Sequence, residues 1–294
     1  MLTIWAILLM SMTMISLVEY VRYSGEEALL SEAEFRALNL AESGLAVGLH
    51  PNTRRGDAVL KQKMGADSGF DVVINYEGAR IPINYATDER LREAIYNLFI
   101  YWQLNAEDAQ IAADSLADWI DNDTSPRANG AEKDYYEGLG IFDAPRNQGF
   151  LRVDEMVLVR GMDAVDQKKP DWREYFSVYG EGQIDLRTVF KDVLLAVTGA
   201  SENDVDRFIR ERDGGDGIPG TEDDRRIRDD DAYQLLGLSG DRLASLRAIV
   251  NDDDTSLRRI TSIGWAGTKR AEIIVVTRRN QETGAVTYLG RIEE

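Results

Sequence analysis

The longest apolar segment of the sequence lies at its N-terminus, where residues 1–18 carry no charge and the first ionisable side chain is Glu19. A membrane-spanning helix needs roughly 17 to 25 predominantly apolar residues, so this segment is just long enough to cross a bilayer. A cleaved signal peptide is the alternative, but it would need a basic start and a small-residue cleavage site. Because the sequence shows neither, the pattern favours a transmembrane helix.

Apolar residues continue beyond this segment at the three- and four-residue spacing that places them on one face of a helix. This stripe consists of Leu30, Ala33, Ala37, Ala41, Leu45 and Leu49. No proline interrupts it before Pro51, so we predict one continuous helix about 70 Å long, half of it in water. Acids outnumber bases between Glu19 and Glu42, and segments poor in lysine and arginine are the ones that cross a membrane. We therefore expect the body of the protein outside the cytoplasm.

β-branched and aromatic residues cluster in short segments at both ends of the remaining chain, which predicts strands. Segments 70–76 and 80–85 flank a glycine-containing turn and predict a β-hairpin. Three further strands are predicted at 258–265, 272–278 and 285–292. We expect all of these strands to pair in one antiparallel sheet whose parts are far apart in the sequence.

The long segment between the two strand groups has the pattern of helices. The strongest candidates are 91–104 and 106–120. Farther along, Gly161, Gly199 and Gly237 recur at equal intervals, each between a helix end and a new helix start. This spacing indicates either repeated helical hairpins or chance matches to a loose pattern. Ser201, followed three residues later by Asp204, has the capping pattern of a helix start.

Composition excludes several classes of function. The 294 residues include 52 acids against 34 bases, for a net charge of −18, so the chain repels nucleic acid phosphates. There is no cysteine and one histidine, His50, which removes thiolate nucleophiles, cysteine or histidine zinc sites and serine-histidine triads. Sites for hard cations, built from carboxylates, remain open.

Four segments together resemble the general secretion pathway protein K family, the large minor pseudopilins of type II secretion. They are NLAESGLAVGL (39–49), LADWIDNDTSPRANGAEKDYY (116–136), FLRVDEMVLVRGM (150–162) and QIDLRTVFKDVLLAVTGASENDVDRFIRER (183–212). The order of tryptophan, aspartate, proline, NGAE and the tyrosine pair between Trp119 and Tyr136 is specific. The C-terminal strands match only in pattern.

The resemblance implies an α+β fold: a pilin-like long N-terminal helix and a small antiparallel sheet, interrupted by a large all-α insertion of SAM-like helical hairpins. The expected domains are a transmembrane and stem helix (1–50), the first part of the sheet domain (51–86), the inserted helical domain (87–254) and the completing strands (255–294).

The resemblance also implies a function and its partners. The expected role is to initiate or cap a short periplasmic pseudopilus, in contact with other minor pseudopilins, the major pseudopilin and the inner membrane, with no nucleic acid or small-molecule substrate. The chain would be a single-pass inner-membrane protein with its C-terminal body in the periplasm. A basic leader ending in glycine would precede the apolar run of such a prepilin, and we expect it upstream of Met1 or lost from this sequence.

The stretch RDGGDGIPGTEDD is the most site-like in the chain. Its carboxylates are Asp213, Asp216, Glu222, Asp223 and Asp224, set among glycines. Calcium takes six to eight oxygen ligands, and such a loop could fold back to offer them, although the spacing is not that of an EF-hand. Because the resemblance is to a family whose members can bind calcium, these carboxylates are the candidate calcium ligands; a solvated acidic loop is the slightly favoured interpretation, since runs of charge are usually exposed.

A second acidic cluster contains Asp118, Asp121, Asp123, Glu132 and Asp134. We interpret these residues mainly as helix and turn caps, because aspartate commonly accepts hydrogen bonds from its own local backbone. Paired carboxylates can also hydrolyse glycosides when held roughly 5 to 10 Å apart in a cleft. A membrane-tethered, calcium-dependent extracytoplasmic hydrolase is therefore the alternative to a non-enzymatic assembly protein.

Overall fold

The computed structural model describes residues 2–218, 221, 223–225, 227–250, 257–280 and 283–293. The chain divides into two compact units. The first comprises Met1–Ile74, Ile260–Val275 and Gly290–Glu294, and the second comprises Asn75–Arg259 and Val276–Leu289. Both units contain residues from strands of the main sheet.

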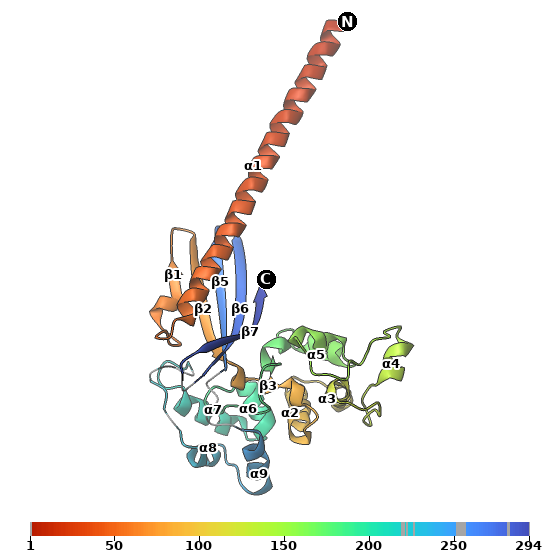
Figure 1. Cartoon of the computed structure of the whole chain (residues 1–294), viewed down its shortest axis with the longest axis vertical. Helices are drawn as coiled ribbons and strands as arrows, with labels where there is room; N and C mark the ends of the chain where they lie inside the picture. The colour runs from red at the N-terminus through yellow and green to blue at the C-terminus, as the bar shows by residue number, and fades with distance from the viewer. Residues whose placement is uncertain are drawn as a thin grey trace. The chain divides into compact units, whose positions relative to one another are not determined.

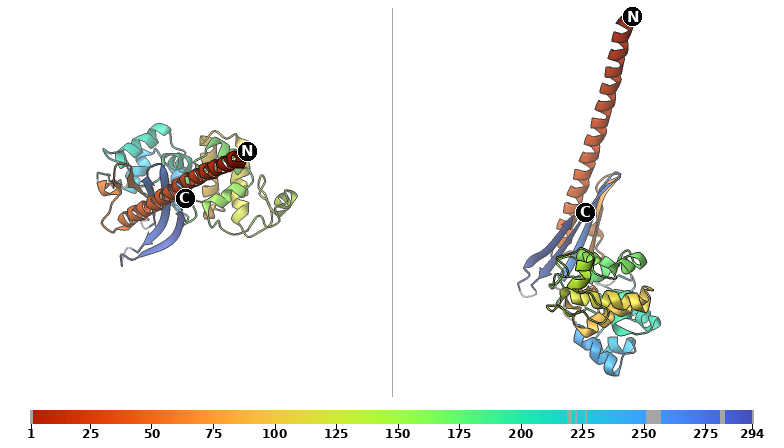
Figure 2. Two further views of the ribbon diagram at one scale, coloured as in Figure 1. Left: turned by 90° about the horizontal axis from the view of Figure 1, so that it is seen from above. Right: turned by 90° about the vertical axis from the view of Figure 1, so that its right-hand side faces the viewer.

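The first unit is organised around one long helix, α1 (Leu2–Leu49), which runs without a break and ends at the last residue of the predicted stripe. Figures 1 and 2 show its C-terminal part lying along the strands while its N-terminal part extends away from them. Among the described residues, no helix has the combination of length and hydropathy that crossing a membrane requires.

The main sheet has five strands in the order β1-β2-β5-β6-β7. Their bounds are β1 (Lys61–Lys63), β2 (Ser68–Tyr76), β5 (Leu257–Ala266), β6 (Lys269–Arg279) and β7 (Val286–Glu293). β1 pairs antiparallel with β2, with Lys61 opposite Asp71. The three predicted C-terminal strands are confirmed, and they join strands from the start of the chain in one sheet as expected.

Small residues let α1 approach the sheet closely. A Cβ added to Gly264 of β5 would lie 2.1 Å from the Ala37 carbonyl oxygen and 2.3 Å from the Ala41 nitrogen. On the helix side, a Cβ on Gly44 would meet the Ser262 Oγ at 2.4 Å. The Ser262 hydroxyl donates a 2.7 Å hydrogen bond to the Ala41 carbonyl, which ties strand to helix directly.

An apolar core fills the space beside these contacts. It contains Ala41, Leu45, Leu60, Phe70, Val72, Ile74, Ile260, Ile273 and Val275. The predicted stripe thus points at the sheet from Ala37 to Leu45, where its members are at most 4% exposed. Leu30, by contrast, is 49% exposed, so the stripe is covered only in its C-terminal half.

The second unit is mainly helical. Its α-helices are α2 (Glu89–Tyr101), α3 (Ala106–Ile120), α4 (Lys133–Gly138), α5 (Met162–Lys168), α6 (Lys191–Thr198), α7 (Glu202–Arg212), α8 (Asp229–Leu235) and α9 (Gly240–Ile249). 3-10 helices occupy Glu77–Ala79, Ile83–Tyr85, Val153–Leu158 and Trp172–Tyr175, and a fifth, Ala58–Leu60, belongs to the first unit. Buried aromatic and aliphatic residues from α2, α3, α6 and α7 form one core.

The glycine repeat corresponds to helical hairpins at two of its three positions. Gly199, with φ +58°, ends α6, and Gly237, with φ +67°, follows α8, each before a new helix. At Gly161 the preceding segment is a 3-10 helix instead, and α5 begins directly after the glycine. The predicted cap is confirmed, because the Ser201 side chain accepts a hydrogen bond from the Asp204 nitrogen.

The predicted hairpin of 70–76 with 80–85 is wrong. The second segment splits into a 3-10 turn and β3 (Ile81–Pro82), which pairs in parallel with β4 (Phe176–Ser177) in a separate two-stranded sheet. We attribute this difference to the charged residues beside the predicted turn, which form ion pairs with residues far away in the sequence. Glu77 accepts a 2.7 Å bond from Arg259, and Arg80 donates to Glu174 at 3.3 Å.

Substituting Gly264 with alanine should destabilise the first unit. The added Cβ would overlap backbone atoms of α1, so we expect a loss of about 1 to 3 kcal/mol or more in the free energy of unfolding. Gly138→Ala is the matched control, since a Cβ there meets nothing within 4 Å. Urea unfolding of the purified chain measures both, and equal midpoints for the two variants would contradict the close packing.

The Glu77–Arg259 pair predicts a dependence of stability on pH. Burial alone would raise the pKa of Glu77, but the charges of Arg259 and Arg80 lower it below its ordinary value. The stabilisation by ionised Glu77 is therefore complete above the ordinary glutamate pKa of about 4.3 and is lost as pH falls through the lower, folded pKa.

Glu77→Gln should cost about 3 to 5 kcal/mol at pH 7, because it leaves Arg259 buried without its counter-charge. The difference in unfolding free energy between wild type and variant should shrink on acidification below about pH 4. Urea titrations at several pH values test this. A difference that stays constant down to pH 2 would show that the ionised pair contributes nothing.

Candidate functional site

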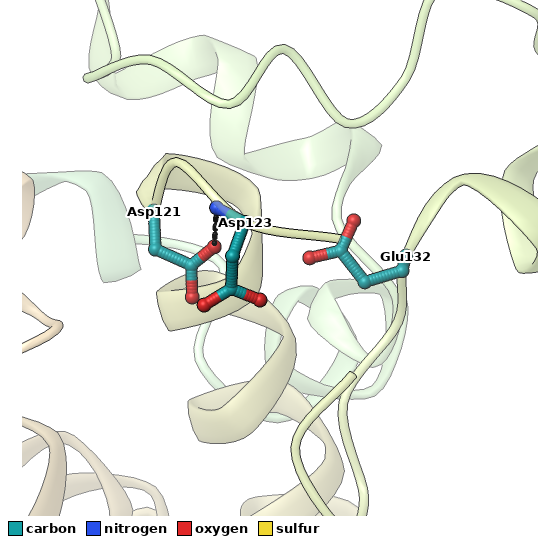
Figure 3. Close-up of side chains that lie close together, drawn as sticks. All are labelled: Asp121, Asp123 and Glu132. Carbon is teal, nitrogen blue, oxygen red and sulfur yellow. Dashed lines mark hydrogen bonds between the residues drawn. The ribbon is translucent and has the colours of Figure 1, made fainter. Parts of the chain in front are cut away.

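The second acidic cluster gathers where α3 ends and α4 begins. Asp121 is the C-cap of α3, Asp123 lies in the following turn, and Glu132 precedes the first residue of α4. One carboxylate oxygen from each lies within 4.8 Å of the others. Figure 3 shows the Glu132 carboxylate facing those of Asp121 and Asp123.

Local caps account for part of this cluster, as the sequence predicted. Asp121 Oδ1 accepts a 3.4 Å bond from the Asp123 nitrogen, and Asp123 Oδ1 accepts a 2.8 Å bond from the Ser125 nitrogen. Asp134 lies in the first turn of α4, where a negative charge favours the helix. Glu132 differs, because its side chain makes no capping bond.

Glu132 is 5% exposed, and neither of its carboxylate oxygens has a hydrogen-bond partner. Burial, together with the negative charges of Asp118 and Asp121, raises the pKa of Glu132 to about 7. A cavity of about 420 Å³ adjoins this residue and is also lined by Thr124 and Asn147. Glu132 therefore combines burial, unused acceptors and access to a cavity.

Arg127 neutralises the adjacent acids. Its Nη1 lies 2.5 Å from Asp118 Oδ1 and 2.5 Å from Asp121 Oδ2, and its backbone nitrogen also donates to Asp118. Asp118 is fully buried, and a Cβ on Gly130 would lie 1.8 Å from its Oδ2. The glycine of the NGAE segment is thus required for Asp118 to occupy this position.

Aromatic packing fixes the two sides of the cluster. Trp119 meets Tyr136 edge-on with ring centroids 5.3 Å apart and stacks on Phe150 at 6.1 Å. Trp119 and Tyr136 are 2% and 1% exposed, and the Tyr136 hydroxyl accepts a bond from the Arg160 nitrogen. The tryptophan and tyrosine-pair motif thus holds the end of α3 against the start of α4.

In the loop predicted to bind calcium, the described carboxylates already have protein partners. Asp213 is buried and paired with Arg212 at 2.5 Å. Asp223 Oδ2 accepts bonds from the Gly215 and Asp216 nitrogens at 2.7 and 3.1 Å. Bonds from the Thr221 hydroxyl, and then these backbone bonds, lower the pKa of Asp223.

Two other acids of this loop also accept hydrogen bonds. Asp216 Oδ1 accepts one from the Ile218 nitrogen, and Asp224 Oδ1 accepts one from the Thr221 hydroxyl. Glu222 lies outside the described residues. Calcium binding by this loop stays a prediction.

Helix α1 presents a further candidate site, the apolar side chains along it that the first unit leaves exposed. Phe35 is 66% exposed on the same helix whose Ala37 is fully buried. Nearer the N-terminus the exposed apolar and aromatic side chains are Trp5, Met10, Met12, Met14, Leu17, Tyr20, Tyr23 and Leu30. Phe35 lies outside the predicted stripe, and periodicity alone therefore did not identify it.

Comparisons with known proteins agree with the resemblance found in the sequence. Residues 74–170 match the family model described as "Type II secretion system (T2SS), protein K". A chain in the crystal structure of the GspK-GspI-GspJ complex from the enterotoxigenic Escherichia coli Type 2 Secretion System has a similar fold, with a TM-score of 0.64 and 18% identity. The match covers 94% of this chain and 99% of that chain. A comparison with curated protein sequences found no match.

The predicted resemblance to the protein K family of type II secretion is thus confirmed by the family model over residues 74–170, and the solved structure has a similar fold. The matched segment contains α2, α3, α4 and α5, and with them the acidic cluster and its aromatic support.

Removing Arg127 should destabilise the second unit strongly. Arg127→Gln would leave the buried Asp118 charge uncompensated, at a cost of about 3 to 5 kcal/mol. Arg152→Gln is the control, because its pair with Asp154 is exposed on both sides and contributes about 1 kcal/mol or less. Thermal unfolding compares them, and the double variant Asp118→Asn with Arg127→Gln should recover part of the loss. Equal stability of the two single variants would contradict the buried pair.

Proposed function

We propose that this chain is a minor pseudopilin, a non-enzymatic subunit that helps to initiate or cap a pseudopilus of a type II secretion system. The observation that carries the proposal is the uncovered apolar surface of α1. Only its C-terminal part packs on its own sheet, whereas Leu30, Phe35 and the aromatic and methionine side chains before them are exposed. Exposed apolar side chains in this number along a helix mark a surface for protein or membrane contact.

The same helix supports a position at the tip. Ordinary pilin-like subunits keep a glutamate near the start of the apolar helix, where it neutralises the terminal amine of the subunit above. Residues 1–18 contain no acid. An amine buried without a counter-charge costs several kcal/mol, so a subunit that lacks the acid fits where no subunit lies above it.

The exposed apolar surface of α1 also indicates which proteins would bind this chain. One solved structure of similar fold is that of the GspK-GspI-GspJ complex. We propose that two smaller pilin-like subunits pack on α1 of this chain and that the major pseudopilin continues the filament below them. Residues 1–18 would anchor the chain in the inner membrane, with the body in the periplasm.

Phe35→Asp tests the proposal. Because Phe35 is 66% exposed, the free energy of unfolding should change by less than about 0.5 kcal/mol, while a charge in the helix interface should abolish assembly. In cells lacking the native gene, the variant should restore little secretion and should co-purify with tenfold less of the smaller pilin-like subunits.

Met64→Ser is the matched control, since Met64 is also exposed, at 56%, but lies outside α1. It should secrete and co-purify like the wild type. The proposal would be refuted by normal secretion in the deletion strain, or by Phe35→Asp cells that assemble and secrete as the controls do.

A further inference from the structure

A cavity of about 820 Å³ in the second unit is lined by residues of α7, α8 and α9. It shares no lining residue with the cavity beside Glu132. Its volume lies in the range of roughly 300 to 1,000 Å³ that is usual for ligand sites. Apolar and aromatic side chains form part of its wall, among them the buried Leu186, Phe208 and Tyr233. The cavity therefore offers a ligand an apolar surface.

The charge of this cavity is opposite to that of the whole chain, which carries a net charge of −18. Among the described residues that line it, arginines outnumber acids. The arginines are Arg187, Arg212, Arg225, Arg228 and Arg247, and the acids are Asp224 and Asp230. A cleft in which one sign of charge prevails raises the local concentration of ligands of the opposite sign. The cavity therefore favours an anionic ligand.

The arginines at the surface of the cavity are held by weak ion pairs. Arg228 Nε lies 3.1 Å from Asp231 Oδ2, and at least half of each side chain is exposed. Arg247 Nη2 lies 3.0 Å from Asp230 Oδ1 with similar exposure, and Arg225 is 72% exposed in its own pair. Exposed ion pairs contribute little free energy, so a carboxylate of a ligand can replace or share these partners at low cost.

Two contacts hold the arginines and the apolar wall together. Arg212 is buried, and its Nη1 donates to the Leu186 and Val189 carbonyl oxygens at 3.1 and 2.9 Å, so it fixes the wall rather than meeting a ligand. The Arg247 guanidinium lies over the Tyr233 ring, with its Cζ 5.2 Å from the ring centroid. Stacking of this kind limits the orientations of the guanidinium before a ligand arrives.

A ligand that uses both the arginines and the wall is acidic and partly apolar. Arginine binds carboxylates and phosphates through a planar fork of donors. A small inorganic anion would contact the arginines but not the apolar wall, and nucleic acid is repelled by the net charge of the chain. We propose that this cavity binds an acidic peptide segment of another protein, with its carboxylates at Arg228 and Arg247 and an aromatic side chain against Phe208.

The test is fluorescence anisotropy of a labelled peptide that has glutamates on both sides of one tryptophan, added to the purified full chain in neutral detergent. The wild type should bind this peptide with micromolar affinity. Binding should weaken as sodium chloride is added, because salt screens the attraction between arginine and carboxylate. Peptides with glutamine in place of glutamate, or serine in place of tryptophan, should each bind about tenfold more weakly.

The double variant Arg228→Gln with Arg247→Gln should also bind the peptide about tenfold more weakly. Its unfolding temperature should stay near that of the wild type, because both side chains are exposed. The matched control is Arg90→Gln with Arg152→Gln, which removes the same charge from exposed ion pairs outside the cavity. This control should bind like the wild type.

The proposal is overturned if the wild type does not bind the peptide at millimolar concentration, or if the two double variants bind it equally well. It is also overturned if the glutamine peptide binds as tightly as the glutamate peptide. Binding of inorganic phosphate without binding of the peptide would contradict it as well, since the cavity would then be a site for small anions. Because binding is measured on the isolated chain, these results do not depend on the proposed role in secretion.

Discussion

The close approach of α1 to the sheet is the constraint on which the rest of the first unit depends. Gly264 admits the backbone of Ala37 and Ala41 where any side chain would collide, and Ser262 bonds the helix carbonyl at the same place. Contact this close fixes which face of the helix is buried. Phe35 stays exposed. It belongs to the apolar surface of α1 through which we propose that the other subunits bind.

The second unit is stabilised in a different way. Charged side chains are buried and paired with one another within an aromatic and aliphatic core. Asp118 with Arg127 and Glu77 with Arg259 are pairs whose loss would leave one charge uncompensated. Such pairs contribute little over apolar packing. The Glu77–Arg259 pair joins residues 182 positions apart in the sequence, whereas Asp118 and Arg127 are nine positions apart. Glu132 is the exception, because its carboxyl group is buried without a side-chain counter-charge and its pKa is raised to about 7.

Local patterns predicted the elements whose structure depends on local causes. The C-terminal strands, α3 and the Ser201 cap follow from alternation, helical periodicity and capping chemistry, all of which operate over a few residues. The segment 80–85 was misassigned because Arg80 pairs with Glu174, far away in the chain. The burial of Glu132 was missed for the same reason, since it depends on how α3, α4 and the following loop pack.

The central claim is that the exposed apolar side chains of α1 bind the helices of other pilin-like subunits. The most direct measurement is photo-crosslinking in secreting cells, with a photoreactive amino acid placed at Phe35 or, as a buried reference, at Ala41. The account predicts adducts with pilin-like subunits from position 35 and few or none from position 41. Adducts absent from position 35, or formed only with proteins unrelated to pilins, would contradict it.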